Sequence, residues 1–223
     1  MIWLKKMILR KIINLPVFFV IYMIGTTNTF ATPIYLNNTN ISVTVGGGTS
    51  NGSFNNTFDN GISIEKVIDA PSAIAEEFHN QTTHIWFTAD NVGGGLELLF
   101  NFGQEYNIST LHFWNYTAED FDVDNVDFIF FNSVNQQVGS LSIAPALGNA
   151  SGINAEDILF VAPLNVQFVT AFLTGSNRQV DFQNIGFTAE ISQVPLPTTI
   201  WLFIFGLFVF FVAKLSLFKV LKE

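Results

Sequence analysis

The last thirty residues, 194–223, constrain the fold and location of this chain more than any other segment. They hold an uninterrupted apolar run over residues 200–213, which Lys214 follows. A helix rises about 1.5 Å per residue, so a bilayer core of about 30 Å needs about 20 residues. The run reaches this length if the Lys214 side chain extends to the headgroups and residues 215–218 also lie in the apolar layer. We therefore predict a C-terminal transmembrane helix, with a buried core helix as the alternative.

Residues at the two ends of this run favour the membrane interpretation. Trp201 stands near one end, at the depth of the interface, and Gly206 lies within the run. Lys214, Lys219 and Lys222 mark the other end as cytoplasmic. A terminal helix that is apolar on every face has no obvious partner surface in so small a protein.

A short proline motif precedes the run and carries a family resemblance. Val194-Pro195-Leu196-Pro197, followed by Trp201-Leu202-Phe203 and Gly206-Leu207, resembles the PEP-CTERM sorting signal of Gram-negative bacteria. It is similar to the variant in which Leu replaces the middle Glu. The resemblance implies that an exosortase, a membrane transpeptidase-like cysteine protease, cuts at the motif and passes the protein to the cell surface. Removal of the tail and its retention as an anchor both remain open.

Residues 1–31 have the three-part layout of a secretory signal peptide. A basic region with Lys5, Lys6, Arg10 and Lys11 precedes an apolar region over residues 12–24, and a polar exit ends at Ala31. An uncleaved N-terminal anchor is the alternative. In both cases the middle of the chain crosses the inner membrane of the cell.

Charge is distributed unevenly and supports this topology. Only two of the nine Lys and Arg residues, Lys66 and Arg178, fall within residues 32–193, whereas all eighteen acidic residues except Glu223 do. Two basic against seventeen acidic residues give this part a net charge of −15. Such a domain repels phosphates, which excludes nucleic acid as a partner. The chain has no Cys, which excludes disulfides and thiolate chemistry.

Residues 32–193 read as one all-β domain, a β-sandwich or jelly roll. Short apolar–polar alternations separated by Gly, Asn and Asp recur along this part. A turn at Gly103-Gln104 is expected to join two of the strands, and Ser72 is a plausible N-cap for a helix over 71–78. The expected strands are 41–45, 62–64 with 67–69, 85–87, 96–102, 108–116, 126–131, 138–143, 158–161, 166–172 and 185–191.

The chain contains 25 Phe residues, and several alternate along these expected strands. We expect them to fill the layer between two sheets, in preference to forming a ligand platform. The positions concerned are Phe100, Phe102, Phe128, Phe130, Phe168 and Phe172.

The strand layout carries a second resemblance, to the discoidin-like, galactose-binding jelly roll. It rests on the rhythm of residues 98–116, which end in Trp114-Asn115-Tyr116, and on residues 123–132 and 181–187. The resemblance implies binding of carbohydrate or lipid head groups through loops at one end of the barrel. It also implies a structural calcium in many members, with matching positions near Asp69 and Asn184.

Five side chains are candidates for ligand binding. Trp86, Trp114, Tyr116 and His112 could stack on the C–H faces of a sugar, and Asn115 could bond its hydroxyls. Core packing is the alternative for these residues.

Three alternating carboxylates are further candidates for calcium. Asp120, Asp122 and Asp124 would lie on one side of an extended segment, and oxygen ligands of this kind suit Ca²⁺. A solvated acidic loop is the alternative.

Catalysis finds no positive support in the sequence. His79 and His84 lack the spacing of a zinc protease, and neither a nucleophile elbow nor a phosphate loop is present. We therefore expect a non-catalytic surface protein that binds carbohydrate, such as the exopolysaccharide of a biofilm. A structural matrix or coat protein is the second hypothesis, and an envelope hydrolase is the third.

Overall fold

The structure is a computed structural model that describes residues 32–58, 63–78, 84–192 and 203–211. The signal-peptide prediction over residues 1–31 lies outside the described residues. So do the Val194–Pro197 motif, Trp201 and Lys214. The predictions made for these segments stay predictions.

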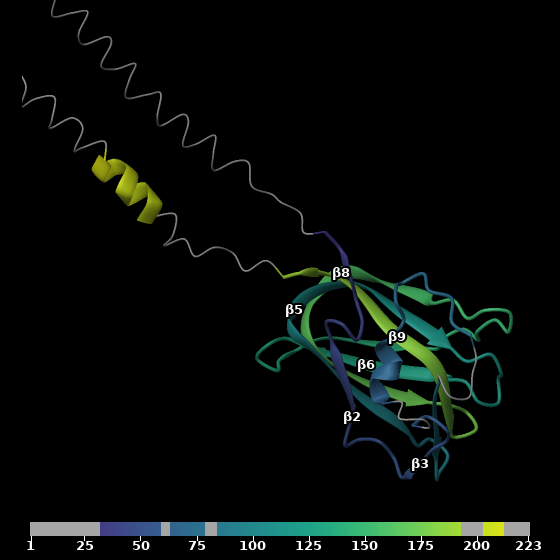
Figure 1. The fold of residues 1–223 in the computed structure, drawn as a ribbon. Helices are drawn as coiled ribbons and strands as arrows, with labels where there is room; N and C mark the ends of the chain where they lie inside the picture. Colours follow the sequence, from purple (N-terminus) through teal and green to yellow (C-terminus); the bar gives the residue numbers. More distant parts are fainter. Residues whose placement is uncertain (1–31, 59–62, 79–83, 193–202, 212–223) are drawn as a thin grey trace, which may run out of the picture. The chain divides into compact units, whose positions relative to one another are not determined.

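The described part of residues 32–193 is built of β-strands and one short 3₁₀ helix, which confirms the all-β prediction (Figure 1). Every pairing between the named strands is antiparallel. The strand order is β3-β4-β9-β5-β8-β6-β7, with β1 on β9 and β2 on β5. The elements are β1 (Ile34–Leu36), β2 (Ser42–Val45), β3 (Gly52–Phe54), η2 (Ile64–Ile68), β4 (Ile85–Ala89), β5 (Gly95–Asn115), β6 (Asn125–Phe131), β7 (Gln137–Ile143), β8 (Glu156–Thr174) and β9 (Gln179–Ile191).

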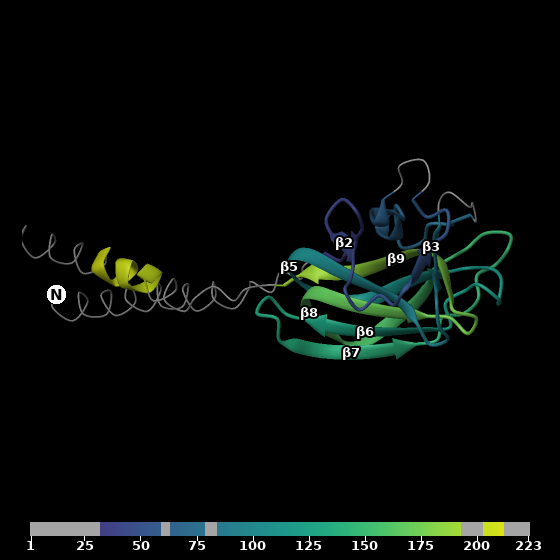
Figure 2. The ribbon, with the colours of Figure 1, turned by 90° about the horizontal axis from the view of Figure 1, so that it is seen from below.

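Two long strands, β5 and β8, connect the two layers of the sandwich. The first part of β5, residues 95–101, pairs with β2 and with residues 168–174 of β8, which also pair with β6. The second part of β5, residues 106–115, pairs with β9. Figure 2 shows β6 and β7 in one layer and β9 in the other.

The expected turn at Gly103-Gln104 is wrong, because the chain bends there and continues as one strand. Gly103 has a φ of 71°, in the left-handed region, and its N–H donates to Asn101 Oδ1 at 2.8 Å. The register of β5 against β8 shifts between Asn101 and Tyr106. A left-handed residue inside a strand produces such a bulge and bend without reversing the chain. The expected strands 158–161 and 166–172 likewise form one strand, β8.

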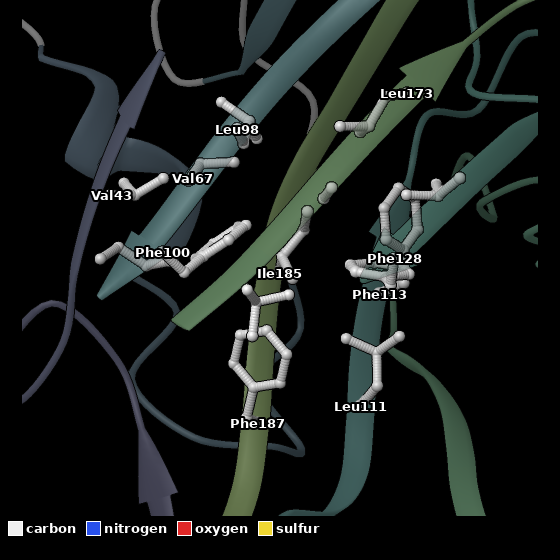
Figure 3. Close-up of a cluster of buried hydrophobic side chains, with 14 of the residues drawn as sticks. Val43, Val67, Leu98, Phe100, Leu111, Phe113, Phe128, Leu173, Ile185 and Phe187 are labelled. Atoms are coloured by element: carbon white, nitrogen blue, oxygen red, sulfur yellow. The ribbon is translucent and has the colours of Figure 1, made fainter. Parts of the chain in front are cut away.

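The core fills the space between the two layers with apolar side chains from alternate strand positions (Figure 3). Phe100, Phe102, Phe128 and Phe130 are buried there, as predicted. Phe168 and Phe172 are only half-buried. Their strand instead contributes its other face to the core through Val166, Val169, Ala171 and Leu173.

Two local predictions over residues 62–78 are wrong. In place of the expected strand segment at 67–69, Val67 and Ile68 form the buried end of the 3₁₀ helix η2, and Asp69 is its C-cap. No helix forms over 71–78, where the backbone of Glu77 instead exchanges hydrogen bonds of 2.8 and 2.7 Å with Ile153. This long-range bridge engages backbone groups that a helix would have used locally, so tertiary contacts override the propensity.

Residues 203–211, which include Gly206, are helical and exposed. Within the described part of the chain, no helix has both the length and the apolar character needed to span a membrane.

Candidate functional site

The candidate site lies on the outer face of β4 and β9. Along β4 the side chains alternate, so that Ile85 and Phe87 are buried in the core while Trp86 between them is half-exposed. Trp86 lies opposite Asp181 of β9 in the register. The indole N–H of Trp86 donates to Gln179 Oε1 at 2.7 Å, which fixes the ring against the neighbouring strand.

The loop between β5 and β6 adds two more rings to this face. The backbone N–H of Asp181 donates to the carbonyl of Phe121 at 3.0 Å, so the loop runs beside β9. The Phe121 ring meets Trp86 edge-on with centroids 6.0 Å apart, and Tyr116 with centroids 6.3 Å apart. Phe121 is 37% exposed. We call Trp86, Tyr116 and Phe121 the aromatic cluster.

A buried histidine–aspartate pair lies next to the aromatic cluster. His84 Nδ1 is 2.8 Å from Asp181 Oδ1, and both side chains are almost fully buried. The His84 ring is 5.9 Å from Trp86 and 6.2 Å from Tyr116. Burial raises the pKa of Asp181 to about 6, although His84 acts in the opposite direction. Burial and the charge of Asp181 also raise the pKa of Tyr116.

A second buried carboxylate, Asp122, lies beside Asp181 through an isolated backbone bridge. Its Oδ2 accepts a bond of 3.3 Å from Asn115 Nδ2. No hydrogen-bond partner reaches its buried Oδ1 from the described residues. Burial, and then the charges of Asp124 and Glu119, raise the pKa of Asp122 to about 6. A buried acceptor without a protein partner is uncommon in folded proteins.

Asn115 has a structural position beneath this loop, not a ligand-facing one. Its Oδ1 accepts the backbone N–H groups of Tyr116 and Val123, at 2.9 and 3.0 Å. Its Nδ2 also donates to the carbonyl of Val123 at 3.0 Å. The amide is 2% exposed, so we interpret it as the residue that holds the loop in place.

Trp114 and His112 are buried away from solvent. The Trp114 ring packs with Ala70 and Ile153, and its N–H donates to the carbonyl of Ala75 at 2.9 Å. His112 lies between Asp157 and Thr188, 2.6 and 2.7 Å from its two ring nitrogens. The interpretation of these two rings as sugar-stacking faces does not fit their burial. Of the predicted aromatic residues, Trp86 and Tyr116 come together.

The predicted row of carboxylates at 120, 122 and 124 does not form. Residues 118–121 make a turn, in which the N–H of Phe121 donates to the carbonyl of Ala118 at 3.0 Å. Asp120 and Asp124 instead accept hydrogen bonds from Asn177 and Ser176 of the turn after β8. Across the described ranges no three His, Asp or Glu side chains gather in a metal-binding arrangement.

The ammonium group of Lys66 occupies the position near Asp69 where the discoidin-like resemblance implies a calcium ion. Lys66 Nζ lies 2.6 Å from Asp69 Oδ1 and 4.0 Å from Glu77 Oε2. Asn184 uses its Oδ1 to accept the backbone N–H of Ala70 at 3.0 Å. The residues at this position therefore do not fit a bound calcium ion, because an ammonium group already neutralises the carboxylates.

Sequence reasoning missed Phe121, Asp181 and His84 as parts of the candidate site. Asp181 carries a signal, because it is a charged residue between two buried strand residues, Val180 and Phe182. Phe121 carries another, as an aromatic residue inside an acidic run. Neither signal shows which strand the side chain will lie against, or on which face of the sheet it will lie.

No family model matches this chain, and no curated protein matches it. Solved structures do. The chain is similar to the family 32 carbohydrate-binding module of Clostridium perfringens NanJ, solved in complex with galactose. That likeness has 8% identity and a TM-score of 0.47, and covers 70% of this chain and 99% of the module.

Two other similar structures are bacterial domains. An F5/8 type C domain from Bacteroides fragilis has 10% identity and a TM-score of 0.46, over 72% of this chain and 98% of that domain. A fucose-binding module of Streptococcus pneumoniae has 15% identity and a TM-score of 0.42, over 65% of this chain and 96% of the module.

Proposed function

We propose that this chain is a non-catalytic carbohydrate-binding protein and that the aromatic cluster is its sugar-binding surface. One observation carries the proposal: three half-buried or exposed rings meet on one outer sheet face, beside the buried carboxylates of Asp122 and Asp181. Aromatic faces suit the C–H surfaces of a sugar ring, and the exposed edges of these rings are open to such a ligand.

Charge narrows the class of glycan. The exported part carries seventeen acidic residues and two basic ones, a net charge of −15. An anionic polymer would be repelled over the whole domain surface. We therefore propose a neutral polysaccharide, such as an exopolysaccharide of the producing cell.

We propose no catalytic step. Asp181 is held by His84 at 2.8 Å, and Asp122 is held by Asn115. Both carboxylates are buried and have a fixed structural partner, so neither is placed to transfer a proton to a leaving group.

The location of the protein is part of the proposal. The signal-peptide layout of residues 1–31 and the tail over 194–223 support export across the inner membrane of a Gram-negative bacterium. The tail would then be recognised by an exosortase-type protease, or remain as a membrane anchor.

Titration of the full-length protein in detergent with neutral polysaccharides tests the binding proposal. Calorimetry is expected to give saturable binding to a neutral polymer and none to a uronic acid polymer. Trp86→Ala should weaken that binding about two- to tenfold, because one aromatic contact contributes about 0.5–1.5 kcal/mol beyond the apolar area that it buries. Leu159→Ala is the matched control, since Leu159 is an apolar residue of β8 that is 75% exposed and lies outside the cluster.

Two results would overturn the proposal. Absence of saturable binding to any glycan would favour a structural matrix or coat protein. Release of shortened sugar chains during the titration would indicate an envelope hydrolase.

A further inference from the structure

Lys66 is the only lysine within residues 32–193, and it is placed inside the fold. Its side chain is 10% exposed, although lysine is almost never buried unless it is paired. A domain with a net charge of −15 would gain most from this positive charge at its surface. The burial of Lys66 therefore requires a specific reason.

The ammonium group of Lys66 is held between two carboxylates. Asp69 Oδ1 lies 2.6 Å from Nζ, and Glu77 Oε2 lies 4.0 Å away. The side chains of Asp69 and Glu77 are 34% and 17% exposed. Without a cation, two like charges would face each other in a partly dehydrated space, which is costly.

The surroundings of the three charges are also polar and buried. The Tyr35 hydroxyl is buried without a hydrogen-bond partner in the described part of the chain, and so is Asn184 Nδ2. Burial and the charges of Glu77 and Asp69 raise the pKa of Tyr35. Burial likewise raises the pKa of Glu77, although the positive charge of Lys66 acts in the opposite direction.

The segment that carries these charges closes over the outer face of β5 and β9. Asn184 of β9 binds the backbone of Ala70, and the carbonyl of Ala75 accepts the Trp114 N–H. Glu77 bridges Ile153 through its backbone. Lys66, Asp69 and Glu77 therefore belong to a segment that is attached to the sandwich at Ala70, Ala75 and Glu77.

We propose that the Lys66 ammonium takes the position in which a divalent cation would otherwise hold this segment, so that the domain folds without calcium. Lys66 acts as a built-in counter-ion for Asp69 and Glu77. The domain thereby becomes insensitive to the free calcium concentration outside the cell. This inference does not depend on sugar binding.

Thermal unfolding of the full-length protein in detergent, followed by near-ultraviolet circular dichroism, tests the proposal. The wild-type midpoint should be the same in millimolar calcium and in excess chelator. Lys66→Met, which keeps the length of the side chain but not its charge, should lower the midpoint in chelator by about 5–10 °C. Millimolar calcium should restore a large part of this loss, because binding to the folded state alone raises stability.

Arg178→Met is the matched control. It removes the other positive charge of the domain, but the Arg178 guanidinium is exposed and donates to the carbonyl of Asp90. This variant should show no calcium response. If Lys66→Met does not fold in chelator, the double variant Lys66→Met with Glu77→Gln relieves the repulsion and should fold without calcium.

Three outcomes would overturn the proposal. A wild-type midpoint that rises with calcium would mean that the ion binds despite the ammonium group. An unchanged midpoint for Lys66→Met would mean that the two carboxylates need no counter-ion. A lowered midpoint that calcium does not raise would mean that the position does not accept a cation.

Discussion

At the scale of single residues, Asp122 links the electrostatics of the candidate site to the stability of the fold. Its pKa of about 6 lies above the ordinary value of 3.8, so the folded chain keeps a proton that the unfolded chain has released. The free energy of unfolding contributed by Asp122 is therefore fully present below about pH 4 and is lost as the pH rises through about 6. Asp181 acts in the same direction.

We predict that Asp122→Asn makes the fall in stability between pH 4 and pH 7 shallower by about 1–2 kcal/mol. Denaturant unfolding at several pH values measures this slope. Asp127→Asn, on the exposed side of β6, is the control. Equal slopes for wild type and Asp122→Asn would contradict the prediction.

Residue types gave only a partial view of the candidate site. Trp86 and Tyr116 were chosen as ligand candidates because aromatic faces suit the C–H surfaces of a sugar. Trp114 was chosen on the same argument, yet its ring fills a buried pocket with Ala70 and Ile153. Trp114 differs from Trp86 and Tyr116 because the segment with Ala70 and Ala75 covers its ring. That segment lies 39 residues earlier in the chain, counted from Ala75.

At the scale of elements, Gly103 lets one strand serve both layers. Its φ of 71° is costly for any residue with a Cβ atom, whereas the space around a Cβ at this position is open. We predict that Gly103→Ala lowers the free energy of unfolding by about 1–2 kcal/mol through backbone strain alone. Chemical denaturation measures the loss.

Gly47→Ala is the control for this prediction. A Cβ at Gly47 also meets open space, and the φ of Gly47 is outside the left-handed region. A loss of stability as large as that of Gly103→Ala would mean that backbone conformation is not the cause.

Strands with strong alternation were predictable, and those with little or none were not. The segments 85–87, 96–102, 126–131, 138–143 and 185–191 all lie in observed strands. The short strands β1 and β3 carry only three residues each, too few for a period to be read. The continuity of β5 and β8 depends on partners far along the chain, which local patterns do not reveal.

At the scale of the whole molecule, the separation of charge between the termini and the middle bears on location. We predict that the full-length protein fractionates with membranes in an exosortase-deficient Gram-negative host and that a chain ending at residue 193 does not. Immunoblotting of membrane and soluble fractions measures this.

Pro195→Ala with Pro197→Ala should block release at the surface in a host that has the protease, while Pro33→Ala, outside the motif, should not.

The arrangement of β9 has a mechanical consequence. This strand begins beside the aromatic cluster at Gln179 and Asp181, and it ends at Ile191, just before the tail. Along its length it is bonded to β4, β5 and β1. If the aromatic cluster binds a polymer and residues 194–223 anchor the chain in a membrane, as proposed, tension would pass along β9 from the cluster to the tail. The hydrogen bonds between β9 and its neighbours β4, β5 and β1 would be loaded in shear and would have to break together. The domain would then resist unfolding under flow better than a fold in which such bonds break one after another.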